Sequence, residues 1–156
     1  SSLVGSEMCI RDRFMITDLL GKHVQTAERA EDWKDAIRMA AAPLLENGSI
    51  RASYIDAMIH NVEVNGPYIV IMPDVAMPHS RVEDGALKTD ISILKLKDGV
   101  AFPQDNIVHL IIALSANDND AHMQLLSDMV DVFMDEDKMN GLLHAECVED
   151  IRRVLA

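Results

Sequence analysis

Residues 65–81 read NGPYIVIMPDVAMPHSR, and this stretch decides the fold. Its apolar run, residues 68–72, is closed by Pro73 and predicts a short buried strand. Further on, Pro78 fixes its own φ and pushes the residue before it towards extended geometry. We therefore expect the strand to feed a stiff segment that presents His79 at a strand end, where ligands usually bind in α/β sheets.

Apolar residues at helical spacing precede this stretch. Residues 33–45 show that spacing and end before the Asn-Gly pair at 47–48, so they predict an amphipathic helix. We expect a second helix to begin at Ser53, as its N-cap, and to end before residues 65–67.

Strands and helices also alternate after the stretch. The expected elements are strands at 90–97 and 107–114, a helix that begins at 117–120, and a final helix within 146–155. On the first of these strands, Ile91, Ile93 and Lys95 are expected to share one face. Because no linker or repeat interrupts this pattern, it predicts one α/β domain with helices on both faces of a sheet. This alternation does not predict the order of the strands in the sheet.

Composition narrows the class of protein. The chain has 156 residues, of which 49% are hydrophobic and 26% charged, as in a globular domain. Its formal net charge of −12 argues against nucleic acid as a partner. No apolar run reaches the roughly 20 residues that cross a bilayer, and no signal peptide is recognisable, so we expect a cytoplasmic protein.

The N-terminal segment looks foreign to the domain. Residues 1–13 read SSLVGSEMCIRDR, show no convincing period and resemble translated adapter sequence. We expect this segment to be non-native or disordered, Met15 to be the native start, and residues 14–156 to form the domain.

His79 is the candidate nucleophile. A neutral imidazole, whose ordinary pKa is about 6.5, is a competent nucleophile towards phosphorus near neutral pH. His122 follows the N-cap residues at 117–120, in the first turn of a predicted helix. The free N–H groups and the positive dipole end there favour an anion and disfavour imidazolium. A neutral His122 could therefore donate a hydrogen bond to a phosphoryl oxygen on His79.

Other interpretations of the two histidines stay open at this point. They also fit an ordinary loop residue and a surface side chain. Two histidines could ligate a metal, but no HxH, HExxH or Cys/His cluster supplies a third ligand, so no metal is expected.

A family resemblance favours the phosphoryl interpretation. Residues 65–81, together with Val-Ala-Phe-Pro at 100–103, the apolar run at 107–114 and DAHMQLL at 120–126, are similar to the type-2 enzyme IIA domain of the bacterial sugar phosphotransferase system. This is the mannitol/fructose superfamily, and GPYIVIMP leading into VAMPH most resembles its ascorbate-specific branch.

The resemblance implies a function, partners and a fold. His79 would be phosphorylated by the phosphohistidine of HPr and would pass the group to a cysteine of a IIB component, and through it serve a IIC membrane permease. His122 would be the second active-site histidine. The implied fold is a mixed sheet between helices, with no metal and no organic cofactor. A homodimer is plausible for this branch.

Three neighbours of His79 are further candidates. Ser80 could offer phosphate a hydroxyl or backbone donor, and Arg81 a cationic one. Asp74 could orient the imidazole, although a turn at Pro73-Asp74 also explains it.

Two alternatives to the carrier remain. A regulatory IIA-like module would bind target proteins according to its phosphorylation state. In a small-molecule-binding α/β domain, His79 would be incidental.

Overall fold

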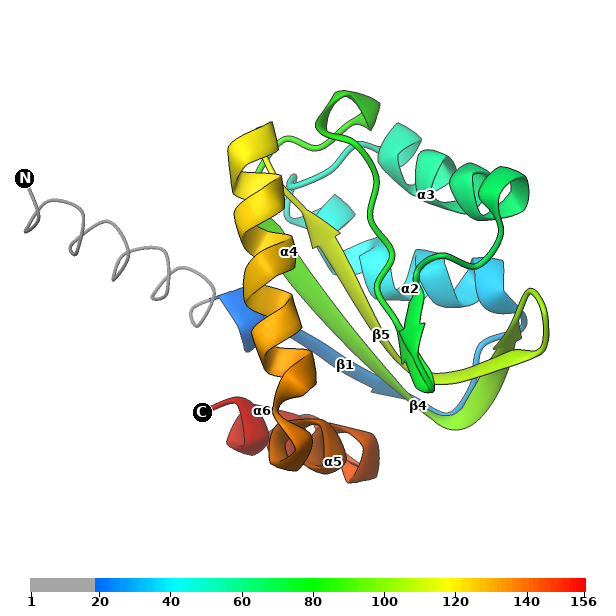
Figure 1. The fold of residues 1–156 in the computed structure, drawn as a ribbon, viewed down its shortest axis with the longest axis vertical. Coiled ribbons are helices and arrows are strands. Elements are labelled where there is room, and N and C mark those ends of the chain that lie inside the picture. Colours follow the sequence, from blue (N-terminus) through cyan, green and yellow to red (C-terminus); the bar gives the residue numbers. More distant parts are fainter. Residues whose placement is uncertain (1–18) are drawn as a thin grey trace, which may run out of the picture.

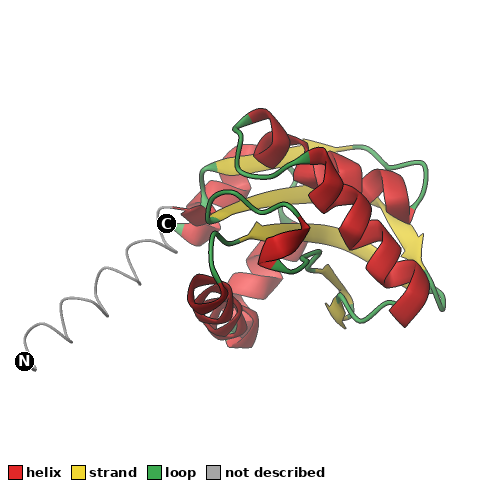
Figure 2. Ribbon diagram, turned by 90° about the horizontal axis from the view of Figure 1, so that it is seen from above, coloured by secondary structure: helices red, strands yellow, loops and turns green. Residues whose placement is uncertain are grey.

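The computed structural model describes residues 19–156 as three layers, with a five-stranded sheet between two groups of helices (Figures 1 and 2). Labels follow Figure 1, in which the first labelled helix is α2. The expectation that residues 1–13 are not native concerns a segment outside the described residues.

The sheet is mixed. Its strands are β1 (His23–Ala27), β2 (Val70–Met72), β3 (Asp74–Ala76), β4 (Asp90–Phe102) and β5 (Asn106–Ser115). They lie in the order β1-β4-β5-β3-β2, with β1/β4 and β3/β5 parallel and β4/β5 and β2/β3 antiparallel. The mixed sheet that the resemblance implied is therefore confirmed.

Helices cover both faces of this sheet, as predicted. They are α2 (Trp33–Glu46), α3 (Ala52–Asn65), α4 (Asn119–Met134), α5 (Glu136–His144) and α6 (Val148–Leu155), and a 3-10 turn covers Val82–Asp84. Helices α2 and α3 pack on one face with Leu94 and Leu96 of β4, whereas α4, α5 and α6 pack on the other with Ile91 and Ile93. The alternation along β4 thus divides the core into two layers.

Lys95 lies on the same face as Ile91 and Ile93, as the alternation predicted. It is buried, and its Nζ donates to the carbonyl of Ala145, between α5 and α6, at 3.1 Å. Burial is the main cause that lowers the pKa of this amine.

The N-cap predicted for α3 is wrong. Arg51 occupies the N-cap position without a side-chain cap bond, and the Ser53 hydroxyl instead donates to the carbonyl of Asp84 at 3.2 Å. The start of α2 follows the expected rule, because the Asp32 carboxylate accepts from the backbone N–H of Asp35 at 2.7 Å.

The strand predicted at 68–72 is shorter and less buried than expected. Only Val70–Met72 are extended, they form the edge strand β2, and Ile71 is 38% exposed. Beyond Pro73 the chain turns through Asp74, whose φ is +71°, into the buried strand β3. Strand β3, rather than β2, therefore leads to His79.

A buried carboxylate closes one end of the sheet. Asp90, 1% exposed, accepts from the Ser49 hydroxyl at 2.7 Å and from the Asn47 amide at 3.1 Å, and His23 Nε2 lies 3.0 Å from the same oxygen. These bonds satisfy a charge that would otherwise be costly to bury, and they tie β1 and the α2–α3 connection to β4.

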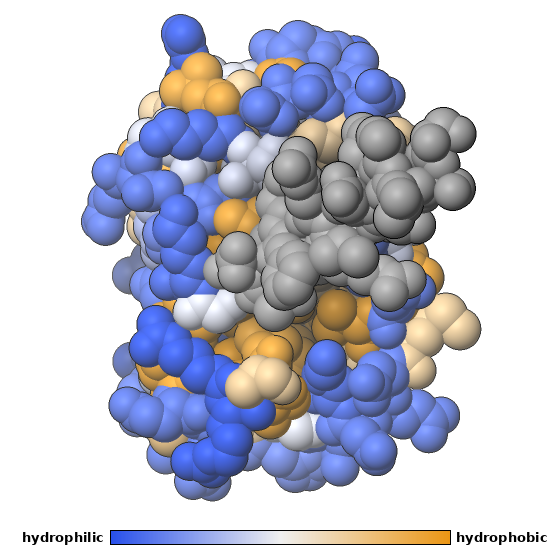
Figure 3. All heavy atoms as spheres, turned by 90° about the vertical axis from the view of Figure 1, so that its left-hand side faces the viewer, coloured by the Kyte–Doolittle hydropathy of each residue, from blue (hydrophilic) through white to orange (hydrophobic). Residues whose placement is uncertain are grey.

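The surface is largely hydrophilic on the face shown in Figure 3, where blue residues surround a smaller apolar area beside the grey ones. Among the described residues, no helix is long and apolar enough to cross a membrane.

Candidate functional site

The segment that carries His79 is fixed by backbone hydrogen bonds. The N–H of Met77 donates to the carbonyl of Ile69 at 2.8 Å, and the N–H of Leu114 on β5 donates to the carbonyl of Pro78 at 3.0 Å. His79 therefore leaves the C-terminal end of β3 from a braced position. The predicted strand-end location is right, although the strand that supplies it is β3.

The position of the His79 ring defines its tautomer. Nδ1 lies 2.8 Å from the carbonyl oxygen of Met77. A carbonyl can only accept, so Nδ1 carries the hydrogen and the lone pair stands on Nε2. Nε2 is thus the nitrogen that can act as a nucleophile.

The structure brings His122 to His79. The two ring centroids are 5.7 Å apart, with an interplanar angle of 54°. His122 lies in the first turn of α4, where the Asp118 carboxylate caps the helix through the N–H of Ala121 at 2.7 Å. Among the described residues, Nε2 of His122 is a buried polar atom without a hydrogen-bond partner. Such an atom is costly to leave unpaired, so this nitrogen is available to a ligand beside His79.

Tyr68 completes the aromatic surroundings of His79. Its ring meets the imidazole edge-on, with centroids 5.9 Å apart and an interplanar angle of 86°. The sequence interpretation took Tyr68 only as the first residue of a strand. Tyr68 directly follows Gly66-Pro67, a pair typical of turns. This pair is the sequence signal that could have placed Tyr68 in a turn rather than in the strand.

Burial keeps His79 neutral. Loss of solvent is the main cause that lowers its pKa below the ordinary 6.5; the hydrogen bond to Met77 opposes this, and nearby His122 adds to it. The neutral form, which holds the nucleophilic lone pair, is therefore the form present at pH 7.

This lowered pKa predicts a pH effect on stability. Below pH 6.5 the unfolded chain takes up a proton on His79 before the folded chain does, so the free energy of unfolding falls as the pH falls through the window from 6.5 to the folded pKa. We expect an NMR titration of the His79 ring protons to give a midpoint below 6.5. We also expect the pH dependence of unfolding to weaken in the His79→Gln protein. A midpoint above 6.5 would contradict the desolvated environment.

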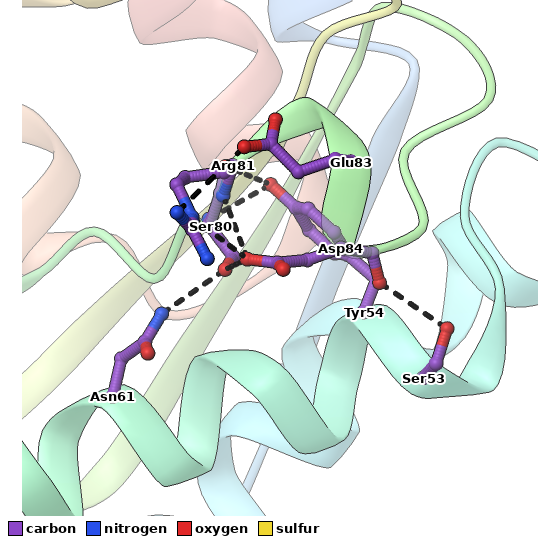
Figure 4. A network of polar contacts seen from close by, with 7 residues as sticks. All are labelled: Ser53, Tyr54, Asn61, Ser80, Arg81, Glu83 and Asp84. Carbon is purple, nitrogen blue, oxygen red and sulfur yellow. Dashed lines mark hydrogen bonds and ion pairs between the residues drawn. The ribbon is translucent and has the colours of Figure 1, made fainter.

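The neighbours Ser80 and Arg81 are engaged with the protein (Figure 4). The Ser80 hydroxyl donates to the Asp84 carboxylate and accepts from the Asn61 amide at 3.0 Å. The Arg81 guanidinium lies 3.7 Å from both Glu83 and Asp84. Arg81 is largely exposed and can exchange these carboxylates for a phosphate, so its phosphate contact stays a prediction. Ser80 has no free donor, because its N–H also has a partner, Tyr54.

The orienting role expected for Asp74 is wrong. Its carboxylate lies 3.0 Å from Nδ1 of His109 on β5, while the Met77 carbonyl holds the His79 ring. The cause is the left-handed turn at Asp74, which starts β3 at the end far from His79.

Among the described residues, no three His, Cys, Asp or Glu side chains gather as a metal site would require. The fold and the paired histidines define an α/β domain in which a half-buried imidazole with a free ring nitrogen lies beside a second histidine.

Comparison with known proteins identifies the family to which this α/β domain belongs. Residues 19–156 match the family described as the phosphoenolpyruvate-dependent sugar phosphotransferase system, EIIA 2. The mannitol-specific cryptic phosphotransferase enzyme IIA component of Escherichia coli is 35% identical over 134 residues, which cover 85% of this chain and 91% of that protein. The ascorbate-specific EIIA component of Escherichia coli is 32% identical over 124 residues, covering 78% and 80%.

Solved structures of enzyme IIA proteins have the same fold as this chain. The solution structure of a mannitol-specific cryptic enzyme IIA from Escherichia coli superposes with a TM-score of 0.82 at 34% identity, covering 90% of this chain and 97% of that one. A complex of mannitol enzyme IIA with phosphorylated enzyme IIB from Escherichia coli matches with a TM-score of 0.71 at 26% identity, covering 84% and 92%. The chain therefore belongs to the type-2 EIIA family of this phosphotransferase system, whose members transfer phosphoryl groups through a histidine.

Proposed function

We propose that Nε2 of His79 accepts a phosphoryl group from the phosphohistidine of HPr and passes it to a cysteine of a IIB component. The observation that carries the proposal is the free lone pair on Nε2 of a neutral, half-buried imidazole, whose ring centroid lies 5.7 Å from that of a second histidine. Family membership supports the reaction class, since IIA domains pair with IIB components.

In both proposed transfer steps, each bond that forms is matched by one that breaks, and no further reactant is needed. In the first step the lone pair of Nε2 attacks phosphorus, a new N–P bond forms, and the N–P bond of the donor breaks, leaving its electron pair on the donor imidazole. In the second step a cysteine thiolate attacks, an S–P bond forms and the His79 N–P bond breaks. Each step needs alignment and charge stabilisation more than covalent help from the protein.

His122 is proposed to stabilise the charge on the transferring group. As an Nε2–H tautomer it donates a hydrogen bond to a phosphoryl oxygen, which gives its buried nitrogen the partner it lacks. The positive end of the α4 dipole adds to the field that favours negative charge on the transferring group.

Onward transfer separates the carrier from a regulatory IIA-like module. Labelled phosphoenolpyruvate, enzyme I and HPr are incubated with the protein, and a IIB component is then added. We expect the label to leave His79 and appear on the IIB cysteine. Label that remains on His79 in the presence of every IIB tested would favour the regulatory alternative.

The same assay addresses the sugar. The ascorbate assignment rests on the resemblance of the VAMPH region, while relatives specific for mannitol and for ascorbate both match. We propose ascorbate, and expect faster transfer to a IIB of an ascorbate system than to a mannitol IIB. The reverse order would assign the protein to a mannitol-type system. The homodimer remains a prediction, to be tested by light scattering.

A further inference from the structure

The residues on both sides of His79 are linked to Leu114 of β5, Pro78 directly and Ser80 through Tyr54. The carbonyl of Pro78 accepts from the N–H of Leu114 at 3.0 Å. On the other side, the N–H of Ser80 donates to the hydroxyl of Tyr54 at 3.0 Å, and that hydroxyl lies 2.7 Å from the carbonyl of Leu114. Tyr54, in the first turn of α3, thus closes a clamp around the His79 backbone.

The hydroxyl of Tyr54 is fully used in this clamp. It has one hydrogen, and the carbonyl of Leu114 at 2.7 Å is a better acceptor position than the carbonyl of Ser80 at 3.3 Å. Its oxygen is then free to accept the Ser80 N–H. Tyr54 is only 1% exposed, and burial raises its pKa to about 12, so the hydroxyl keeps its hydrogen at physiological pH.

The side chain of Ser80 braces the same point from a second direction (Figure 4). It is bonded to Asp84 in the 3-10 turn and to Asn61, which lies about two turns beyond Tyr54 on α3. Ser80 is therefore an anchor for the segment, which explains why neither of its donors is directed to a ligand.

We propose that Tyr54 is a positioning residue for phosphoryl transfer, whose hydroxyl fixes the His79 backbone so that the imidazole keeps its Nδ1–H tautomer and its place beside His122. This inference rests on the proposed function. The ring of His79 is oriented by the carbonyl of Met77, within the clamped segment, so a shift of the segment moves the nucleophilic nitrogen. Misplacement by about 1 Å lowers a transfer rate by about 10²-fold.

The test is the Tyr54→Phe protein, which keeps the ring and deletes the hydroxyl. We expect the rate of phosphorylation at saturating phospho-HPr to fall by about 10- to 100-fold. The KM for phospho-HPr should change little, because Tyr54 is 1% exposed and its replacement leaves the protein surface as it is. Nitrogen NMR of the His79 imidazole should show a loss of the dominant Nδ1–H tautomer.

The Ser49→Ala protein is the matched control. It also loses one buried hydroxyl, which donates to Asp90 at 2.7 Å on β4, and both rates are normalised to folded protein. We expect Ser49→Ala to lower stability without changing the transfer rate or the His79 tautomer. Equal rates and an unchanged tautomer in Tyr54→Phe would overturn the positioning role, because only stability would then depend on the hydroxyl.

A measurement on the wild-type protein covers the case in which Tyr54→Phe does not fold. The amide of Ser80 should exchange with solvent far more slowly than a free loop amide, because Tyr54 accepts its hydrogen. Unprotected exchange would overturn the clamp. Failure of the proposed function shows separately, as a wild-type protein that gains no phosphate on His79, and it would remove the transfer role of Tyr54 as well.

Discussion

The His79→Ala protein is expected to take no phosphoryl group from phospho-HPr, while the wild-type protein is phosphorylated. The reason is chemical, because the variant lacks the Nε2 lone pair that attacks phosphorus. No substitute nucleophile is expected to replace it, because Nε2 of His122 is proposed to carry a hydrogen and to donate it rather than to attack phosphorus. The measurement is incorporation of labelled phosphate over time.

His144→Ala is the matched control for this loss. His144 is an exposed histidine at the last turn of α5, and its Nδ1 lies 2.8 Å from the carbonyl of Asn140. We expect His144→Ala to be phosphorylated at the wild-type rate. Phosphorylation of the His79→Ala protein at an unchanged rate would refute His79 as the acceptor and favour the interpretation in which this histidine is incidental.

The His122→Ala protein should keep the covalent site but transfer slowly. Removing a single donor that stabilises transition-state charge costs about 10²–10³-fold in rate, and we expect a decrease in that range for transfer from phospho-HPr. His79 should still be fully phosphorylated after a long incubation. A rapid-quench time course measures both quantities.

His109→Ala serves as the control for His122→Ala. His109 lies on β5 and contacts Asp74 at 3.0 Å, away from the Met77 carbonyl that holds His79. Its replacement should leave the transfer rate unchanged. If His122→Ala also transferred at the wild-type rate, the unpartnered nitrogen at the start of α4 would have no part in the reaction.

The long elements of this fold could be predicted because each carries a complete local signal. Strand β5 is an almost unbroken apolar run, and α2 has a capping carboxylate at Asp32 and a Gly at position 48 with φ +75°. In α4, apolar residues at helical spacing come immediately after the N-cap residue Asp118. Such signals depend only on neighbours in the sequence.

The elements that were missed draw their stability from distant parts of the chain. Strand β1 reads HVQTA and is extended because it pairs with β4, while β3 has only three residues and pairs with β5. Helix α5 is the exception among the missed elements, because it is polar on balance but the Asp135 carboxylate that caps it is a local signal. A local sequence pattern does not show which distant strand will pair with a short segment such as β1 or β3.

The candidate site shows the same division. The two histidines were predicted from a Pro-preceded loop and a helix start, and the structure brings them together. Three features that hold or surround His79 were not predicted: the carbonyl of Met77, the ring of Tyr68 and the hydroxyl of Tyr54. A backbone carbonyl has no residue-type signature, and Tyr54 reaches the site from another helix. Sequence proximity favoured Asp74 and Ser80 instead, but their side chains are engaged with His109 and with Asn61 and Asp84, respectively.

Intact-mass measurement after incubation with phosphoenolpyruvate, enzyme I and HPr tests the central claim most directly. We predict a mass gain of one phosphoryl group on the wild-type protein, lost on brief acid treatment as a phosphohistidine requires, and absent from the His79→Ala protein. A protein that gains no mass, or a gain that persists in the His79→Ala protein, would contradict the assignment of His79 as the phosphoryl carrier.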